Sequence, residues 1–337
     1  MADVVTAPVR SAAPPVAAAG ATTLSIVIVT WNSERWIEPC LQSLPAACDG
    51  VPYEIVIYDN ASIDGTLRRL PDDSVRVIRS SRNDGFAAGT NRALAQSTGR
   101  FVFLLNPDCE LEPRALALLV DFLDKHPHAA AAAPLLADAG GGSQREFQLR
   151  RLPTLRGLAA EALLVDKIIP KNKATAHYRY ADLDLSNPQR IEQPAAAALL
   201  VRRSVFDQIG GFDEQFSPAW FEDVDFCRRL AEAKLELFVV PAAKARHAGG
   251  ASLEHMPYAR FIDLWYRNMW RYARKWFSPG QAEALRWAVV VGMMMRCAAA
   301  AVGFRNGSST RWEALRTYAR VLQKALNRWD DSSPSSL

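Results

Sequence analysis

The chain is predicted to adopt an α/β fold with a doubly wound sheet, and two features of the sequence carry that prediction. Short apolar runs rich in β-branched residues alternate with segments of helical apolar spacing up to residue 125, with short connections between them. The runs are largely continuous, which is typical of parallel strands buried on both faces. The 337 residues, 49% of them hydrophobic, suffice for one large domain or two moderate ones.

Four strand–helix pairs are expected in the first half of the chain. The runs LSIVIVT, EIVIYD, VRVIRS and FVFLLN predict strands over 24–30, 54–59, 75–80 and 101–106. Helices are expected over 36–44, from about 66, after the glycine-rich entry NDGFAAG, and over about 113–125. Such alternation predicts a doubly wound, mixed (Rossmann-like) sheet with helices on both faces.

The second half is less regular. Residues 138–193 show no clear period, whereas 195–213 predict a strand, a short helix and a turn at Gly210 and Gly211. A further strand is expected over 236–241, and helices from 258 onward. Residues 1–23 and 331–337 are interpreted as disordered tails.

Polar residues follow the predicted strands of the first half. They fall in 30–34, 59–65, 83–91 and 106–108, at the carboxyl ends where ligands bind in open α/β sheets. Asp59 is suited to accept hydrogen bonds from a pyrimidine imide or a ribose hydroxyl, or simply to shape a turn with Asp64. Asp108 in NPDCE is suited to bind a hard divalent cation, or to cap the next helix.

Three carboxylates (Glu222, Asp223 and Asp225) lie among aromatic residues in WFEDVDFCRR. Partial desolvation by such neighbours raises the basicity of a carboxylate, which then can accept a proton from an attacking hydroxyl. The alternative is an acidic helix start that complements the helix dipole. His247, in KARHAGGAS, is either a metal ligand or a histidine that satisfies an ordinary hydrogen bond.

Composition excludes several classes of function. A formal charge of +4 with no basic tract in the first half argues against nucleic-acid binding. The five scattered cysteines favour a reducing compartment and argue against a structural zinc site. No basic start followed by an apolar core is present, so we expect no secretory signal.

The C-terminal segment carries two patterns. Residues 258–277 mix aromatics with Arg and Lys at amphipathic spacing, and 287–304 are strongly apolar except for Arg296. A spanning helix needs about 20 apolar residues and a central Arg is costly, so we expect an interfacial or re-entrant helix on an anionic leaflet. The alternative is a helix packed against the rest of the protein.

Seven motifs together resemble the inverting family 2 glycosyltransferases, specifically their rhamnosyltransferase-like bacterial branch. The resemblance spans 24 to about 255, in the family's order. The motifs are LSIVIVTWNSE, EIVIYDNASIDGT, NDGFAAGTNRA, FVFLLNPDCEL, LLVRRSVFDQIGGFDEQF, FEDVDFCRRL and VVPAAKARHAGGAS.

The resemblance implies a GT-A fold over 24–255, with a nucleotide-binding half (24–137) and an acceptor-binding half (138–255). The C-terminal patterns described above add a helical extension over 256–330, which we expect to associate with a membrane. It implies that Asp223 is the general base, with Glu222 and Asp225 as supports or rivals. It also implies a Mg²⁺ or Mn²⁺ ion held by Asp108 and His247, with Asn106 in place of the first acid of a DxD motif. The nucleotide contacts that it implies are Thr30, Asn32, Glu34, Asp59 and Asn91.

The function that the resemblance implies is transfer of rhamnose from dTDP-rhamnose, with inversion, to a glycan or lipid-linked acceptor in cell-surface polysaccharide or glycolipid synthesis. The expected location is the cytoplasm, at the inner face of the membrane. A UDP-hexose donor is an alternative within the class. A non-catalytic nucleotide-sugar-binding scaffold and a nucleotidyltransferase are alternatives from other classes. A nucleotidyltransferase is expected to carry a glycine-rich triphosphate loop after the first strand, but this chain has WNSERW there.

Overall fold

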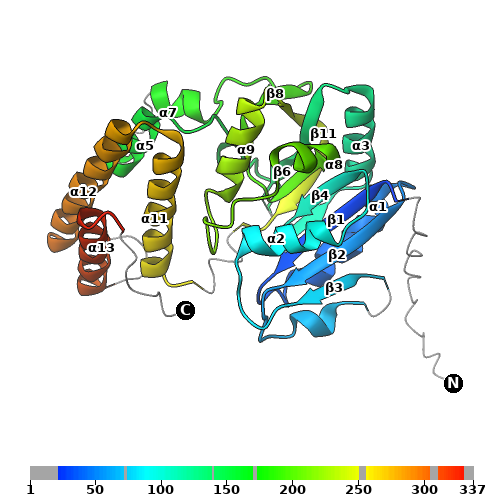
Figure 1. Ribbon diagram of the computed structural model, residues 1–337, viewed down its shortest axis with the longest axis horizontal. Helices are drawn as coiled ribbons and strands as arrows, with labels where there is room; N and C mark the ends of the chain where they lie inside the picture. Colours follow the sequence, from blue (N-terminus) through cyan, green and yellow to red (C-terminus); the bar gives the residue numbers. More distant parts are fainter. Residues whose placement is uncertain are drawn as a thin grey trace, which may run out of the picture.

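The computed structural model describes residues 22–71, 74–138, 140–169, 173–249, 256–303 and 310–329. The two predicted tails, apart from residues 22 and 23, lie outside these ranges. The described residues form a nine-stranded sheet (Figure 1). Its strands are β1 (Leu24–Thr30), β2 (Tyr53–Asp59), β3 (Arg76–Arg79), β4 (Phe101–Leu105), β5 (Cys109–Leu111), β6 (Ala129–Ala137), β8 (Gln189–Ile191), β10 (Ala198–Arg202) and β11 (Glu236–His247).

The sheet has a parallel half and a mixed half. Its order is β3-β2-β1-β4-β10-β6-β11-β5, with β8 paired to β11. Strands β3, β2, β1 and β4 are parallel, and β10 is antiparallel to both of its neighbours. The four strands predicted in the first half are confirmed. Thr30 lies opposite Asp59, and Ile28 opposite Leu105, so these strands end at one edge.

Two elements in this region differ from the prediction. The helix expected from about residue 66 is one 3₁₀ turn, η1 (Thr66–Arg69), because Pro71 disfavours helical geometry at Leu70, which is extended. The strand predicted to end at Pro241 continues to His247. A register shift between Val240 and Lys244 accommodates the proline, which has no N–H to give to the ladder.

Helices cover both faces of the sheet, as predicted. On one face, α1 (Ile37–Cys48) and α3 (Ala115–Lys125) pack on alternate residues of β1 such as Ile26 and Ile28. On the other face, α2 (Phe86–Ala95), α8 (Arg203–Ile209) and α9 (Glu222–Glu232) pack with Val27. Both faces of β1, β4 and most of β2 are therefore buried, which explains their continuous apolar sequence, whereas the edge strand β3 is partly exposed.

The less regular segment forms short elements beside the sheet. They are α4 (Arg145–Gln148), β7 (Leu149–Arg150), α5 (Leu155–Ala162), α6 (Val165–Ile168), α7 (Lys173–Tyr178) and β9 (Gln193–Pro194). Strands β7 and β9 pair with each other in a separate two-stranded sheet.

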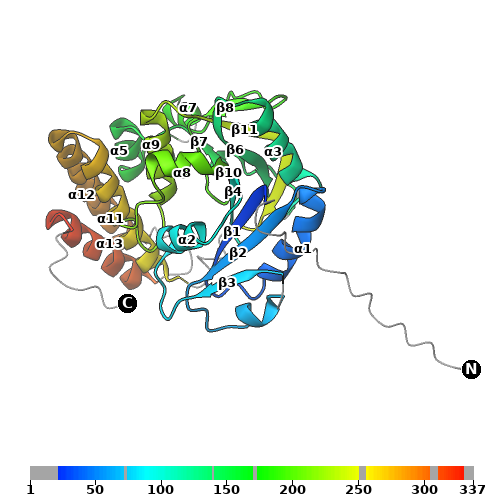
Figure 2. The same ribbon diagram turned by 45° about the vertical axis from the view of Figure 1, so that its right-hand side comes forward.

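Three C-terminal helices, α11 (Tyr258–Trp276), α12 (Pro279–Ala301) and α13 (Arg311–Leu326), share a core with α5 at one end of the molecule (Figures 1 and 2). Helix α11 holds the segment before α9. Its Arg267 and Arg271 donate to the carbonyls of Ser217 and Gln215, both at 2.5 Å. These arginines therefore bind protein carbonyls.

Helix α12 has one packed face and one exposed face. It is the one helix among the described residues long and apolar enough to cross a membrane by length and composition, and 39% of its most apolar window is buried. On the packed face, Gly292 lets the Ala162 carbonyl of α5 approach, since a Cβ there would collide with it. Arg296 donates to the same carbonyl at 2.6 Å. This face of α12 is therefore packed against the rest of the protein, as the alternative to a membrane helix predicts.

Candidate active site

Thr30 and Asp59 meet at the carboxyl end of the parallel strands. The Thr30 hydroxyl donates to Asp59 Oδ1 at 2.9 Å, and the Ser62 hydroxyl donates to the same atom at 2.6 Å. The Ser62 N–H donates to Asp59 Oδ2 at 3.0 Å, and Asp59 is 1% exposed. This is the turn-shaping role expected as an alternative for Asp59. A contact with a nucleotide stays a prediction.

Asn32 and Glu34 join the loop after β1 to the loop after β2. Asn32 Oδ1 accepts from Ile63 N–H at 2.9 Å, and Glu34 Oε2 accepts from Gly65 N–H at 2.8 Å. A Cβ at position 65 would collide with the Glu34 carboxylate, so glycine allows this carboxylate to approach the backbone without shifting. Both side chains line a surface cavity of about 510 Å³, and their predicted nucleotide contacts remain untested.

Asn91 lies elsewhere. Its amide Nδ2 donates to Phe212 C=O at 2.8 Å, and its Oδ1 accepts from Phe212 N–H at 2.8 Å. The side chain thus fixes the turn after α8, and Gly211 leaves the space for it. The predicted turn at Gly210 and Gly211 is confirmed, and a contact of Asn91 with a nucleotide stays a prediction.

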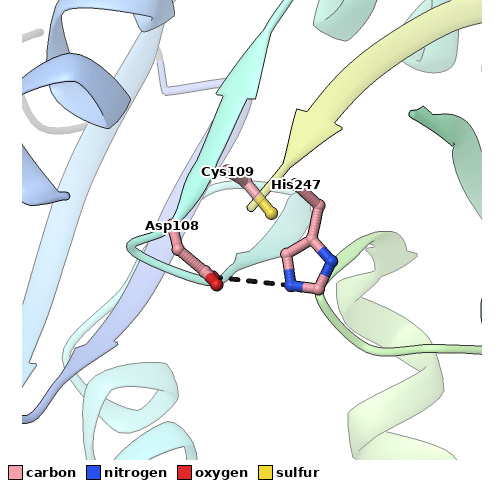
Figure 3. Close-up of side chains that lie close together, drawn as sticks. All are labelled: Asp108, Cys109 and His247. Carbon is pink, nitrogen blue, oxygen red and sulfur yellow. Dashed lines mark ion pairs between the residues drawn. The ribbon is translucent and has the colours of Figure 1, made fainter. Parts of the chain in front are cut away.

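Asp108 and His247 form the proposed metal pair, although they are far apart in the sequence. In the sheet, His247 of β11 lies opposite Cys109 of β5, which places its ring beside Asp108. Figure 3 shows the two side chains turned toward each other, with His247 Nε2 3.5 Å from Asp108 Oδ1. Both residues are buried: Asp108 is 8% exposed and His247 is 3% exposed.

Gln144 sets the tautomer of His247, and the sequence alone did not identify it. Its Nε2 donates to the His247 carbonyl at 2.7 Å, which turns Oε1 toward His247 Nδ1 at 3.0 Å. Nδ1 must therefore carry the proton, and Nε2 presents its lone pair to the Asp108 carboxylate. Two acceptors that face each other in a buried site fit a shared cation, held by a histidine that an outer amide orients. Burial lowers the pKa of His247, despite the opposing effect of Asp108, which favours this neutral form.

Cys109 completes a cluster with Asp108 and His247 in which the potential ligand atoms lie within 4.8 Å of one another. Its Sγ donates to Ala197 C=O at 3.4 Å, and burial raises the pKa of the thiol well above its ordinary value. Because the thiolate is the form that binds metals, Cys109 fits a hard cation poorly. Asn106 stands at the same turn, and its ligand role stays a prediction.

Glu222 and Asp223 open helix α9 directly after two residues in the left-handed region, Trp220 (φ 72°) and Phe221 (φ 73°). Non-glycine residues adopt this geometry only where their surroundings enforce it. Asn268 of α11 does so by donating to the carbonyls of Ala219 at 2.8 Å and Trp220 at 3.0 Å. The strained turn therefore fixes where the two carboxyl groups point.

Burial is the main cause of the unusual basicity of this pair. It raises the pKa of Asp223 above 3.8, although N–H donors and the charge of Arg150 oppose the shift. The pKa of Glu222 is raised well above 4.5, by burial and then by the negative charge of Asp223. Glu222 Oε2 is buried without a hydrogen-bond partner, which fits a protonated carboxyl. Of the two, Asp223 is half-buried and Glu222 is buried, so Asp223 is the more accessible to solvent, and its role as base stays a prediction.

One dipeptide joins the predicted base to the predicted metal pair. The Ala196 N–H donates to Asp223 Oδ2 at 3.4 Å, and the Ala197 carbonyl accepts from Asn106 N–H at 2.8 Å. Ala196 therefore contacts Asp223, and the next residue, Ala197, contacts the turn that carries Asp108. Thr30 belongs to the same edge, because β1 and β4 are paired up to Leu105. The structure thus brings the predicted base, metal pair and strand-end residues to one edge of the sheet.

Asp225 is a structural carboxylate. It is fully buried, its Oδ1 accepts from Lys275 and Trp276 of α11 at 2.8 Å each, and its Oδ2 accepts from Arg229 at 3.0 Å. All of these donors are protein groups, so Asp225 is poorly suited as a rival base. Its role is to fasten α9 to α11.

Replacing Glu222 by Gln should stabilise the protein increasingly as pH rises. With a raised pKa, the folded state favours the neutral carboxyl. Below about pH 4.5 the carboxyl is neutral in both the folded and the unfolded state, so it costs the fold no stability. As pH rises from there through the folded pKa, the fold loses more and more stability, because the unfolded state ionises more readily. Gln retains the neutral shape and removes this cost. In thermal unfolding, the midpoint of Glu222→Gln should exceed that of wild type at pH 8 and approach it at pH 4.5. Glu232→Gln, exposed on the same helix, is the control. A pH-independent difference would contradict a raised pKa.

Comparisons with known proteins identify the family of the chain. The model of the family described as glycosyl transferase family 2 matches residues 25–210. An N-acetylglucosaminyl-diphospho-decaprenol L-rhamnosyltransferase of Mycobacterium tuberculosis is 30% identical over 298 residues, which cover 81% of this chain and 94% of that protein. The rhamnosyltransferase WbbL of Escherichia coli is 26% identical, covering 66% of this chain and 82% of its own.

A solved structure shares the fold at low sequence identity. It is the mannosyltransferase PcManGT of Pyrobaculum calidifontis in complex with GDP-Man and Mn²⁺. The TM-score is 0.53 at 17% identity, and the match covers 92% of this chain and 88% of that one. The predicted GT-A fold with C-terminal helices is confirmed.

Proposed function

Since the chain belongs to glycosyl transferase family 2 and is a glycosyltransferase, we propose that it transfers L-rhamnose from dTDP-rhamnose to a lipid-linked glycan acceptor, with inversion. The choice of sugar is supported by the two rhamnosyltransferases among its relatives. The choice of acceptor is supported by the name of the mycobacterial relative, which acts on a diphospho-decaprenol. Such a product would serve cell-surface polysaccharide or glycolipid synthesis.

The observation that carries the proposed chemistry is the dipeptide Ala196–Ala197, which bonds Asp223 on one side and the Asn106–Asp108 turn on the other. An inverting transfer needs a base on one side of the anomeric carbon and charge stabilisation of the leaving group on the other. In the proposed mechanism, Asp223 takes the proton of the acceptor hydroxyl as that oxygen attacks. Glu222, held neutral beside it, adds no second negative charge that would oppose the developing positive charge of the sugar.

Asp108 and His247 are the proposed ligands of a Mg²⁺ or Mn²⁺ ion. When bound, such an ion would neutralise the charge that develops on the departing nucleoside diphosphate. Their role in donor binding is supported by the buried arrangement of carboxylate and imidazole lone pair. The protein supplies the orientation through Gln144 and through Phe147, whose ring stacks on His247 with centroids 5.5 Å apart.

A donor screen tests the proposal. Among dTDP-L-rhamnose, UDP-glucose and GDP-mannose, we expect dTDP-L-rhamnose to give the fastest release of nucleoside diphosphate in the presence of a prenyl-diphosphate-linked acceptor. EDTA should remove most of this release, and added Mn²⁺ should restore it. A UDP-sugar preference would correct the donor. An EDTA-resistant rate would contradict the metal site, and absence of release with every nucleotide sugar would contradict the proposed catalytic function.

We further propose that α12 attaches the enzyme to the inner face of the cytoplasmic membrane. The proposal is supported by the exposed side of this helix, which is apolar at Trp287, Val291, Met294 and Met295, with exposures of 37–57%. Their spacing places them on one helical face, and the neighbouring α13 adds exposed arginines at 311, 316 and 320. An apolar face flanked by cations is typical of helices that lie in an anionic interface.

Introducing charge on this face should release the protein from membranes. For the double variant Val291→Glu and Met294→Glu, we expect cosedimentation with anionic vesicles to fall by more than about tenfold, because the apolar face then no longer enters the headgroup region. Gln281→Glu, exposed near the start of the same helix, should have little effect. Unchanged sedimentation of the double variant would contradict attachment through α12.

A further inference from the structure

A cavity of about 900 Å³ lies between the short elements of residues 150–179 and the helices α11, α12 and α13. Figures 1 and 2 show α5 and α7 beside these helices, away from the strands β1, β2 and β3. The volume is in the range of protein sites that bury a small organic ligand. It is separate from Thr30, Asp59 and Asp108, none of which lines it.

The walls of this cavity differ in chemistry. The wall from α11 and α13 is mostly aromatic, with Tyr258, Phe261, Trp265, Tyr266 and Tyr318. The opposite wall is basic. Among the described lining residues, it carries five that are Arg or Lys and two that are acidic, Glu161 and Glu192, and α12 adds Arg296. A cavity with an excess of positive charge on one side and an aromatic wall on the other suits a ligand that is both anionic and apolar.

Three of the cations already have protein partners, which leaves other cations of the cavity to bind the charge of a ligand. Arg151 pairs with Glu192 at 3.2 Å, Arg179 pairs with Glu146 at 3.1 Å, and Arg296 donates to Ala162 C=O. Arg156 and Lys167 are exposed at the rim. These two side chains are free to move toward a phosphate at low conformational cost to the fold.

The cavity adjoins the proposed base. Arg150, on its wall, acts electrostatically on Asp223. The aromatic wall touches the strained turn before α9, with Trp265 and Phe221 centroids 5.1 Å apart and Phe261 and Trp220 centroids 4.9 Å apart. A ligand in the cavity is therefore held beside the carboxylate that activates the acceptor.

The cavity also reaches the exposed apolar face of α12. Arg296 and Ala299 line it, while Met295 and Ala298, the residues before them, are exposed on the outer face of the helix. A chain that leaves the cavity along this helix therefore meets apolar surface on its way out.

We propose that this cavity binds the phosphate-bearing, prenyl end of the acceptor. The rim cations, Arg156 and Lys167, hold the diphosphate, and the aromatic wall holds the first isoprene units. The inference rests on the proposed function, since it names the site for a lipid-linked acceptor. It assigns the acceptor's anchor to the C-terminal helices and leaves the sugar hydroxyl to reach Asp223.

Binding of farnesyl diphosphate to the full-length protein, measured by titration calorimetry, tests the inference. We expect farnesyl diphosphate to bind more tightly than pyrophosphate or farnesol, since each of these offers only one half of the chemistry. Arg156→Gln and Lys167→Gln should each weaken its binding by about fivefold to tenfold, as expected for one charge-assisted contact. The matched control is Arg320→Gln, an exposed arginine of α13 that does not line the cavity.

Two results would overturn the inference. One is unchanged farnesyl diphosphate binding in both rim variants. The other is pyrophosphate binding as tight as that of farnesyl diphosphate, which would make the cavity a simple anion site. Binding of dTDP with Mn²⁺, measured on the same samples, separates this failure from that of the proposed function. Retained dTDP binding in the rim variants shows that only the acceptor assignment is wrong, whereas no dTDP binding in the wild type counts against the donor site.

Discussion

Replacing Asp223 by Asn should lower the rate of sugar transfer by about 10²–10⁴-fold, the range for loss of a general base. Asn has nearly the same shape and can still accept the Ala196 N–H, but its amide cannot take a proton from the acceptor. Because the proposed mechanism holds the donor at Asp108 and His247, donor binding should stay close to that of wild type. The measurement is the turnover rate with dTDP-rhamnose and acceptor, together with the Kd of the donor.

The pH dependence gives an independent check of this base. The carboxylate must be ionised to act, and burial raises the pKa of Asp223 above 3.8. The wild-type rate should therefore rise with pH through an acidic limb above that value, and the residual rate of Asp223→Asn should lack this limb. Near-normal turnover of Asp223→Asn would show that the assignment is wrong. A larger loss in Glu222→Gln would transfer the role to Glu222.

Replacing Asp108 by Ala should weaken metal-dependent donor binding by about 100-fold or more. The substitution removes one of two buried ligands and leaves the His247 lone pair with no anionic partner. The expected result is loss of Mn²⁺ affinity and of Mn²⁺-stimulated dTDP binding, both measured by calorimetry. His247→Ala should act in the same direction.

Cys109→Ser is the matched control, because it changes the third member of the same cluster. Its thiol is protonated and donates to Ala197 C=O, a contact that serine can also make. We expect its Mn²⁺ affinity to stay within about threefold of wild type, since a hard cation prefers oxygen and nitrogen ligands. Loss of Mn²⁺ binding in Cys109→Ser with retention in Asp108→Ala would contradict the proposed ligands.

The central strands of the parallel half could be predicted because they are buried on both faces, and burial leaves continuous apolar runs such as LSIVIVT. Strand β6 could not. Its sequence AAAAAPLLA consists mostly of Ala and Pro, which have low strand propensity, and pairing with β10 and β11 overrides that preference. The continuation of β11 past Pro241 depends on a bulge, which a proline in the sequence conceals.

The site was predictable to the extent that its chemistry lies in local motifs. Asp108 and His247 were expected together, and they face each other at 3.5 Å. Gln144 was missed, because it comes from a segment without periodicity and acts only through a contact 103 residues away. Asp225 and Asn91 share motifs with candidate site residues, but their side chains bind α11 and the Phe212 turn. Motif position alone cannot reveal which direction a side chain takes.

The most direct measurement is anomalous diffraction from crystals grown with Mn²⁺ and dTDP. The central requirement of the mechanism is that Asp108, His247 and Asp223, which lie at one edge of the sheet, surround a single bound diphosphate. We expect one strong manganese peak about 2 Å from Asp108 and from His247 Nε2, with both phosphates on the side that faces Asp223. A peak bound elsewhere, or a diphosphate far from Asp223, would contradict the account.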